Sequence, residues 1–264
     1  MIICNLTGGL GNQMFQYAFG RRLTIKNKTQ LKYHFTNALL NTPRRFELDV
    51  FKIKATPATD RDLKNMGIIK NQTLNRIFYL LDERLGININ KHIVTEKKGQ
   101  QFDPNILNLR GDFYVQGFWQ DKRYFEDIKN IVRNDFTFKN KLDSKNKNVL
   151  ELIKKTNSVG IHVRRGDYVT NKMAPNFIGL DYYLKEIKKK EERAMDLSFF
   201  VFSDDIHWCK KNLKSKRQMY FVAGNKDANA WKDMLLMSQC KEITVANSSF
   251  SWWAYWLNKN TLYK

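Results

Sequence analysis

Short apolar runs alternate with segments in which apolar residues recur at helical spacing, most regularly in the second half of the chain. There the pattern predicts strands at 158–163, 197–202, 218–222 and 242–245, separated by helices at 181–194, 205–213 and 227–239. A further helix is predicted at 149–155 and another at 250–257. Strands that alternate with helices are typical of a parallel α/β sheet. In such sheets ligands bind outside the carboxyl ends of the strands.

The first half of the chain has a less regular pattern. It predicts strands at 1–6, 31–35 and 113–118, and helices at 13–24, 59–66, 74–85 and 121–136. The lysine- and asparagine-rich stretch 139–148 is polar throughout, which is typical of a linker. We therefore predict two domains, residues 1–148 and residues 149–264.

The chain is strongly basic. Its 264 residues include 46 Lys and Arg against 26 Asp and Glu, for a formal net charge of +20. This balance favours anionic partners such as nucleotides, nucleic acid or an anionic membrane surface, although a compositional bias toward lysine explains it equally well. A nucleic-acid-binding protein needs basic residues clustered on one face. Because the lysines are scattered, we expect no nucleic-acid partner, and we keep peripheral contact with an anionic membrane as a hypothesis.

Cysteine usage and the N-terminus indicate a compartment. Cys4, Cys209 and Cys240 are an odd number without metal-site spacing, so we expect buried thiols in a reducing compartment. The first residues lack the basic and apolar regions of a signal peptide, and no segment approaches the roughly 20 apolar residues of a membrane span. We expect a cytoplasmic protein, possibly bound at the inner face of the membrane.

A glycine-rich turn, Gly8-Gly9-Leu10-Gly11-Asn12, follows the first predicted strand. The order strand, glycine turn, helix brings backbone amides and a helix N-terminus against a phosphate. The spacing matches neither the dinucleotide fingerprint nor a P-loop. The alternative is a tight turn without a ligand.

A second motif, His162-Val163-Arg164-Arg165-Gly166-Asp167, ends the strand predicted at 158–163. Residues 162 and 164 point to one face, so His162 and Arg164 line the same pocket. Arg164 offers a planar fork that suits a diphosphate. The alternative is a surface pair of Arg and Asp beside a buried histidine.

Two more polar motifs follow neighbouring strands, Ser203-Asp204-Asp205 and Asn247-Ser248-Ser249. Each could simply cap a helix. A carboxylate at a strand end also suits ribose hydroxyls or a guanine base, and a helix start with serines suits a pyrophosphate. Adjacent acids, like Asp60-Arg61-Asp62, could instead suggest metal. Because arginines are available to neutralise phosphate, we predict a site without a metal or other cofactor.

Together these motifs resemble the bacterial α-1,2-fucosyltransferases of glycosyltransferase family 11. The resemblance rests on residues 8–18, 162–168, 202–205, 233–240 and 246–253, with weaker agreement at 45–48 and 117–120. It implies a GT-B-like α/β fold, in which two Rossmann-like α/β/α domains face a cleft. Residues 1–148 would form the acceptor side and residues 149–264 the donor side.

The activity implied by the resemblance is an inverting, metal-independent transfer. L-fucose would move from GDP-β-L-fucose to the 2-hydroxyl of a terminal galactose on a surface glycan. Another sugar-nucleotide-dependent glycosyltransferase is the alternative, ahead of a nucleic-acid-binding protein. A non-catalytic glycan-binding module is disfavoured, because most tryptophans fall in the apolar helix predicted at 250–257.

The resemblance also implies roles for individual residues. Arg164 would hold the β-phosphate of the donor, while His162 and Asp204 or Asp205 would contact guanosine. Ser248 and Ser249 would hold phosphate oxygens. The remaining residues assigned to the donor are Gly9, Gly11, Asn12 and Arg165.

The proton acceptor is harder to assign. Asp167 is the only acid of the motifs close to the arginines, so we predict it as the base. It could instead pair with Arg165, or phosphate or water could take the proton late in the reaction.

Overall fold

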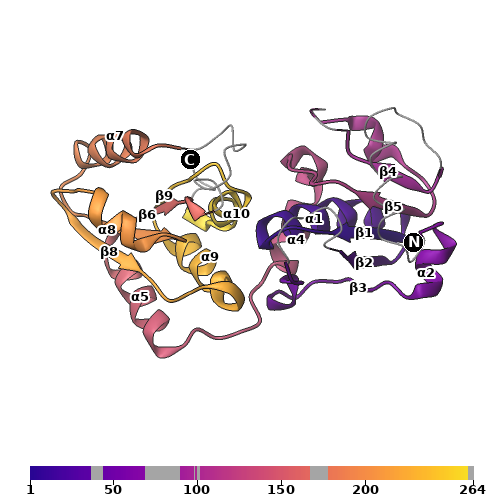
Figure 1. Cartoon of the computed structure of the whole chain (residues 1–264), viewed down its shortest axis with the longest axis horizontal. Coiled ribbons are helices and arrows are strands. Elements are labelled where there is room, and N and C mark those ends of the chain that lie inside the picture. The colour runs from indigo at the N-terminus through magenta and orange to yellow at the C-terminus, as the bar shows by residue number, and fades with distance from the viewer. Residues whose placement is uncertain (37–43, 69–89, 98, 100–101, 167–177, 261–264) are drawn as a thin grey trace. The chain divides into compact units, whose positions relative to one another are not determined.

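The structure is a computed structural model that describes residues 1–36, 44–68, 90–97, 99, 102–166 and 178–260. The chain divides into two compact units, residues 1–139 and 140–264 (Figure 1). Each unit contains its own parallel sheet and associated helices, which confirms the predicted α/β class. The helix predicted at 74–85 and the candidate base Asp167 lie outside the described residues.

The sheet of the first unit has five strands in the order β3-β2-β1-β5-β4, and all its neighbouring strands are parallel. The strands are β1 (Ile2–Leu6), β2 (Leu31–Phe35), β3 (Thr56–Pro57), β4 (Ile93–Thr95) and β5 (Phe113–Gln116). The described α-helices are α1 (Leu10–Asn27), α2 (Asp60–Asn65) and α4 (Lys129–Asp135), and short 3-10 turns span Leu48–Val50, Pro104–Asn108, Lys122–Tyr124 and Glu126–Ile128.

Helix α1 packs tightly on one face of this sheet. The contact is close enough that a Cβ atom added to Gly20 would lie 2.0 Å from the Cys4 sulfur of β1. The predicted apolar side of the helix, with Phe15, Ala18, Phe19 and Leu23, is buried. The central strand and the longest helix of the unit therefore share one core.

Two predicted elements of this unit differ from the structure. The helix predicted at 121–136 is two 3-10 turns followed by α4, because the chain extends at Phe125, whose buried ring lies 6.1 Å from that of Phe15. The strand predicted at 113–118 ends at Gln116, because Gly117 has a φ of 149°. The Glu96 carboxylate then accepts hydrogen bonds from the Phe118 and Trp119 amides.

The sheet of the second unit has four parallel strands in the order β8-β7-β6-β9. The strands are β6 (Asn157–Val163), β7 (Leu197–Ser203), β8 (Gln218–Val222) and β9 (Glu242–Thr244). The described helices are α5 (Ser144–Lys155), α7 (Leu180–Glu191), α8 (Ile206–Asn212), α9 (Ala230–Gln239) and α10 (Ser249–Leu257), with a 3-10 turn at Asp227–Asn229. The strand order reverses between β6 and β9, which makes that gap the topological switch point of the sheet.

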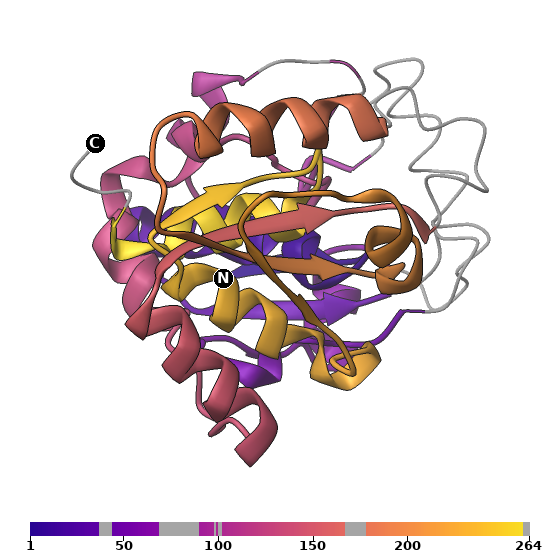
Figure 2. The same cartoon turned by 90° about the vertical axis from the view of Figure 1, so that its left-hand side faces the viewer.

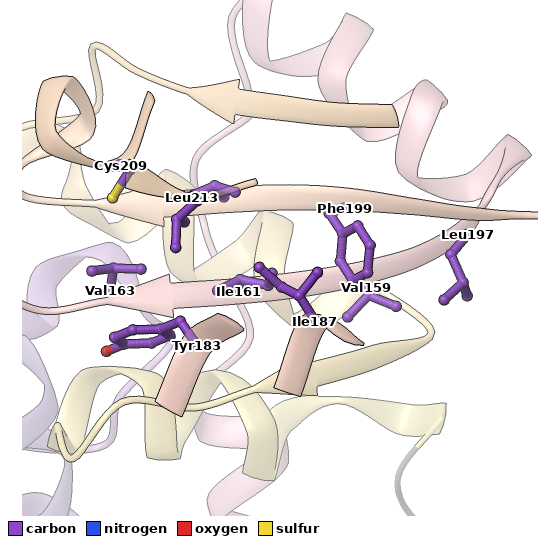
Figure 3. Packing of buried hydrophobic residues seen from close by; sticks show 10 residues of the cluster. Val159, Ile161, Val163, Tyr183, Ile187, Leu197, Phe199, Cys209 and Leu213 are labelled. Carbon is purple, nitrogen blue, oxygen red and sulfur yellow. The ribbon is translucent and has the colours of Figure 1, made fainter. Parts of the chain in front are cut away.

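Strand β6 separates two different environments. Val159, Ile161 and Val163 point to one face, where Tyr183 and Ile187 of α7 pack on them (Figure 3). Helix α7 lies on one side of the sheet, with α5 and α9 on the other (Figure 2). The intervening residues of β6, Gly160 and His162, face the second side, and a Cβ at Gly160 would lie 3.2 Å from the Cys240 sulfur.

The predicted linker is partly wrong. Helix α5 begins at Ser144 because Asp143 accepts a hydrogen bond from the Asn146 amide and so caps it. The predicted domain boundary between residues 148 and 149 falls inside this helix, whereas the compact units divide between residues 139 and 140. The cap predicted at Asp181 is also wrong, because α7 is preceded by Gly179.

A polar network joins the starts of α5 and α9 to the loop after β8. The side-chain amide of Asn225 donates to the Asp233 carboxylate and to the Asn146 carbonyl, each at 2.7 Å. Desolvation raises the pKa of Asp233 from 3.8 to about 7, although the Asn225 hydrogen bond and the Lys145 charge oppose this shift. Asp233 therefore titrates near neutral pH in the folded protein.

We expect Asp233→Asn to stabilise the protein at pH 8. The folded-state pKa lies above the unfolded one, so this group's contribution is most favourable below pH 3.8 and is lost as pH rises to about 7. The loss is at most about 4 kcal/mol. The asparagine keeps an oxygen acceptor for Asn225 but cannot ionise, so urea unfolding should show a gain at pH 8 that disappears at pH 4.

Asp143→Asn is the matched control with the opposite sign. Hydrogen bonds from Lys232 and Asn146 hold the pKa of Asp143 well below its ordinary value of 3.8. This variant should therefore lose stability at pH 8, where the carboxylate is charged. Equal pH profiles for wild type and Asp233→Asn would contradict the prediction.

Candidate functional site

The two charged motifs of the second unit meet at the carboxyl ends of β6 and β7. Val163 and Ser203 are in register, so the residues that follow them are neighbours. The Arg164 guanidinium lies 2.9 Å from one oxygen of Asp204, whose other oxygen accepts the Arg165 backbone N–H at 2.9 Å. A Cβ at Gly166 would lie 2.6 Å from the Asp204 carboxylate, which explains the glycine at this position.

Arg165 is held against α8. Its Nε lies 3.2 Å from the Asp205 carboxylate, and its guanidinium carbon lies 3.9 Å from the Trp208 ring centre. Asp205 also caps α8 by accepting the Trp208 N–H, which confirms the predicted cap. The Arg165 side chain is 17% exposed and that of Arg164 is 29% exposed. Arg164 is therefore the more accessible of the two arginines.

His162 is buried beside these charges. It is 6% exposed, and its ring centre lies 5.6 Å from that of Phe250 in α10. Burial, together with the Arg164 charge, lowers the pKa of His162 to about 3, so the ring is neutral at physiological pH. Its Nδ1 atom is buried without a hydrogen-bond partner. Such an atom favours a ligand at this position.

Helix α10 begins at the same edge of the sheet, beyond the carboxyl end of β9 (Figure 1). Ser248 caps the helix by accepting the Phe250 N–H at 3.3 Å, and Ser249 is its first residue. Trp253 and Trp256 are buried, as predicted, whereas Tyr255 is exposed. The structure thus places Arg164, Ser248 and Ser249 around the switch point between β6 and β9.

In the first unit the glycine turn connects β1 to α1, as predicted. Gly8 has a φ of 77°, and a Cβ there would lie 2.6 Å from the Asn12 side chain. Gly9 precedes α1, while Gly11 and Asn12 belong to its first turn. The Asn12 side-chain oxygen accepts a hydrogen bond from Gln120 at 2.9 Å. The role of these three residues toward the donor stays a prediction.

Sequence reasoning missed the part played by two glutamines of α1. Gln13 is fully buried; its amide donates to the carbonyls of Gly8 and Arg45, each at 2.8 Å, and accepts the Glu47 N–H at 2.9 Å. Gln16 links the Thr7 amide to the Gly117 carbonyl. Two amides one helical turn apart in an apolar segment were the available signal. They hold three of the family-like stretches together.

Glu47 is a carboxylate that sequence reasoning did not single out. It is half-buried, and desolvation raises its pKa, against the pull of Arg45, Arg44 and the Leu10 backbone amide. The carboxylate therefore lies near the N-terminus of α1. It is the described acid of the first unit that most resembles a candidate base.

Comparison with known proteins decides the family. The model described as "Glycosyl transferase family 11" matches residues 86–263. The chain belongs to glycosyltransferase family 11. This family 11 chain is 37% identical to an α-1,2-colitosyltransferase of Escherichia coli, over 99% of this chain and 89% of the relative. It is 32% identical to the O-antigen biosynthesis glycosyltransferase WbnK of Escherichia coli, over 96% and 89% of the two chains.

Solved structures support the fold of this family 11 glycosyltransferase. Fucosyltransferase NodZ from Bradyrhizobium matches with a TM-score of 0.56 at 13% identity, covering 96% of this chain and 91% of NodZ. The GT-B-like fold class is thereby confirmed, and identity this low carries the fold alone.

Two absences concern the described residues only. Across these ranges, no three His, Cys, Asp or Glu side chains gather in a way that could hold a metal ion. Nor does any helix that the structure describes have the length and apolar character to span a membrane. Metal independence and the role of Asp167 stay predictions.

Proposed function

We propose that this family 11 glycosyltransferase moves L-fucose from GDP-β-L-fucose to the 2-hydroxyl of a terminal galactose on a surface glycan, with inversion and without metal. The main support is the placement of Arg164 beside the start of α10 at the switch point of the second sheet. An always-charged fork and the amides of a helix N-terminus are suited to a diphosphate.

The same arrangement suits the chemistry of transfer. As the bond from the sugar to GDP breaks, negative charge grows on the departing phosphate. Arg164 would stabilise this charge because Asp204 already orients its guanidinium. His162 would present its unpartnered Nδ1 to the nucleoside, and Ser248 and Ser249 would bind phosphate oxygens.

A second donor deserves a test because a relative at 37% identity is a colitosyltransferase. Colitose is L-fucose without its 3-hydroxyl. A site that hydrogen-bonds this hydroxyl rejects the deoxy sugar by a factor of about 10⁴–10⁵, whereas an apolar pocket discriminates only about 10- to 200-fold. The ratio of kcat/KM for the two GDP sugars therefore identifies the donor, and faster transfer from GDP-colitose would assign colitose.

We expect the wild-type protein to bind GDP in preference to ADP and UDP, in the presence of EDTA. The expected preference follows from carboxylates placed to accept the two N–H groups of guanine, and the EDTA tests metal independence. Isothermal titration calorimetry measures all three affinities. Equal affinities for the three nucleotides would overturn the GDP-sugar assignment, and binding restored only by Mg²⁺ would overturn metal independence.

A further inference from the structure

The face of the first sheet opposite α1 changes character along its strands. Near the amino ends, Ile3, Tyr114 and Met66 form an apolar cluster. Near the carboxyl ends the same face turns polar, since Asn5 follows Ile3 by two residues and is in register with His34 of β2. A buried polar half of a sheet face needs partners for its polar atoms.

Two of these polar atoms lack partners. Asn5 is 6% exposed and Thr7 is 5% exposed, yet the Asn5 Oδ1 and Thr7 Oγ1 atoms make no hydrogen bond. Leaving a buried acceptor or hydroxyl unsatisfied costs about 1–3 kcal/mol each. Both atoms lie at the end of β1, where ligands of a parallel sheet bind. The pair is explained if a hydroxyl-bearing ligand completes these hydrogen bonds.

His34 is oriented like a catalytic base. Its Nδ1 lies 2.9 Å from the Tyr114 hydroxyl, and the ring is half-buried. Burial lowers the pKa of His34, so the imidazole is neutral at physiological pH. When Nδ1–H donates to the Tyr114 oxygen, Nε2 carries the free lone pair. This matches the arrangement of a base whose second nitrogen is fixed by another group.

The surroundings of His34 favour an uncharged ligand. The nearby titratable groups on this face are Tyr114 of β5, whose pKa burial raises, and Lys32 of β2, which pairs with Asp62 of α2 at 2.7 Å. Gln116 and Thr95 bond to each other at 2.9 Å. The polar half therefore presents neutral side chains, as suits a hydroxyl-rich sugar better than a phosphate or carboxylate.

We propose that this polar half of the first sheet binds the acceptor sugar and that His34 takes the proton from its attacking hydroxyl. The inference rests on the proposed function. The hydroxyl O–H breaks as its oxygen bonds to C1 of the donor sugar, and its proton passes to Nε2 of His34. The bond from C1 to the phosphate oxygen breaks, and GDP leaves with that electron pair.

The test compares His34→Gln with wild type, using GDP-fucose as donor and methyl β-D-galactoside as acceptor. We expect kcat for transfer to fall by about 10²–10⁴-fold. GDP affinity should stay unchanged, because the variant leaves the second unit intact. The acidic limb of the wild-type pH–rate profile should disappear in the residual activity, whereas a merely structural loss would keep it.

Two matched controls separate His34 from other groups. His92→Gln changes a histidine of the same unit whose Nδ1 bonds to the Asp112 carbonyl, and transfer should be unchanged. Glu47→Gln removes the rival carboxylate, and its residual pH profile should keep the acidic limb. Transfer by folded His34→Gln within about threefold of wild type overturns the proposal, as does loss of the limb in Glu47→Gln instead.

Tyr114→Phe keeps the test sharp if His34→Gln fails to fold. It removes the hydroxyl that holds Nδ1, so we expect a displaced acidic limb and an intermediate fall in kcat; an unmoved limb overturns the proposal. If wild type shows no GDP preference, the proposed function fails. If wild type binds GDP and transfers fucose but these variants do not differ from it, only the inference on His34 fails.

Discussion

Arg164→Ala is expected to lower kcat/KM for GDP-fucose by about 10²–10³-fold. The substitution removes the accessible guanidinium at the switch point and leaves Asp204 without its 2.9 Å partner. Arg164→Lys should recover little of the loss, because an ammonium cannot reproduce a planar fork. Steady-state kinetics with GDP-fucose, together with GDP titration, measure both effects.

Arg165→Ala is the matched control on the neighbouring residue. Because Arg165 packs on Trp208 and pairs with Asp205, its loss should lower thermal stability more than donor affinity. If Arg164→Ala binds GDP as wild type does, the phosphate-binding role assigned to Arg164 is wrong. A larger loss of GDP affinity in Arg165→Ala would move that role to Arg165.

Gln13→Leu is expected to destabilise the protein by about 3 kcal/mol or more. The side chain is fully buried, and its removal leaves the backbone groups of Gly8, Arg45 and Glu47 without a partner. Each such group costs about 1–3 kcal/mol when buried and unsatisfied. Urea unfolding followed by circular dichroism measures the change.

The exposed partner of Asn12 supplies the control for this prediction. Gln120→Leu removes one surface hydrogen bond, so its effect should stay within about 0.5 kcal/mol. If both variants unfold at the urea concentration of wild type, Gln13 does not hold the three loops together.

The strands of the second unit could be predicted from the sequence because each is a short apolar run that stops at a polar motif. A parallel sheet then brings the strand ends together without further information, as the register of Val163 with Ser203 shows. Which arginine faces outward could not be predicted. That choice depends on Trp208, whose ring holds Arg165 and lies on the next helix.

The start of α5 was missed because local composition there is misleading. Lysines and asparagines between residues 139 and 148 are typical of a linker, but Asp143 and Asn146 gain partners from Lys232 and Asn225, far along the chain. Gln13 and His34 escaped notice for the same reason. A single polar residue in an apolar segment acquires its meaning only from neighbours that the fold supplies.

The three cysteines of the chain are all buried. Burial raises the pKa of Cys4 to about 12 and that of Cys209 to about 11, and it raises the pKa of Cys240 as well. Because the thiolate is the reactive form, the native chain should resist maleimide dyes. Cysteines introduced at the exposed positions Ile131 and Met195, one in each unit, would then be labelled selectively. Energy transfer between the two dyes could follow the separation of the units as GDP is added, with no native cysteine removed.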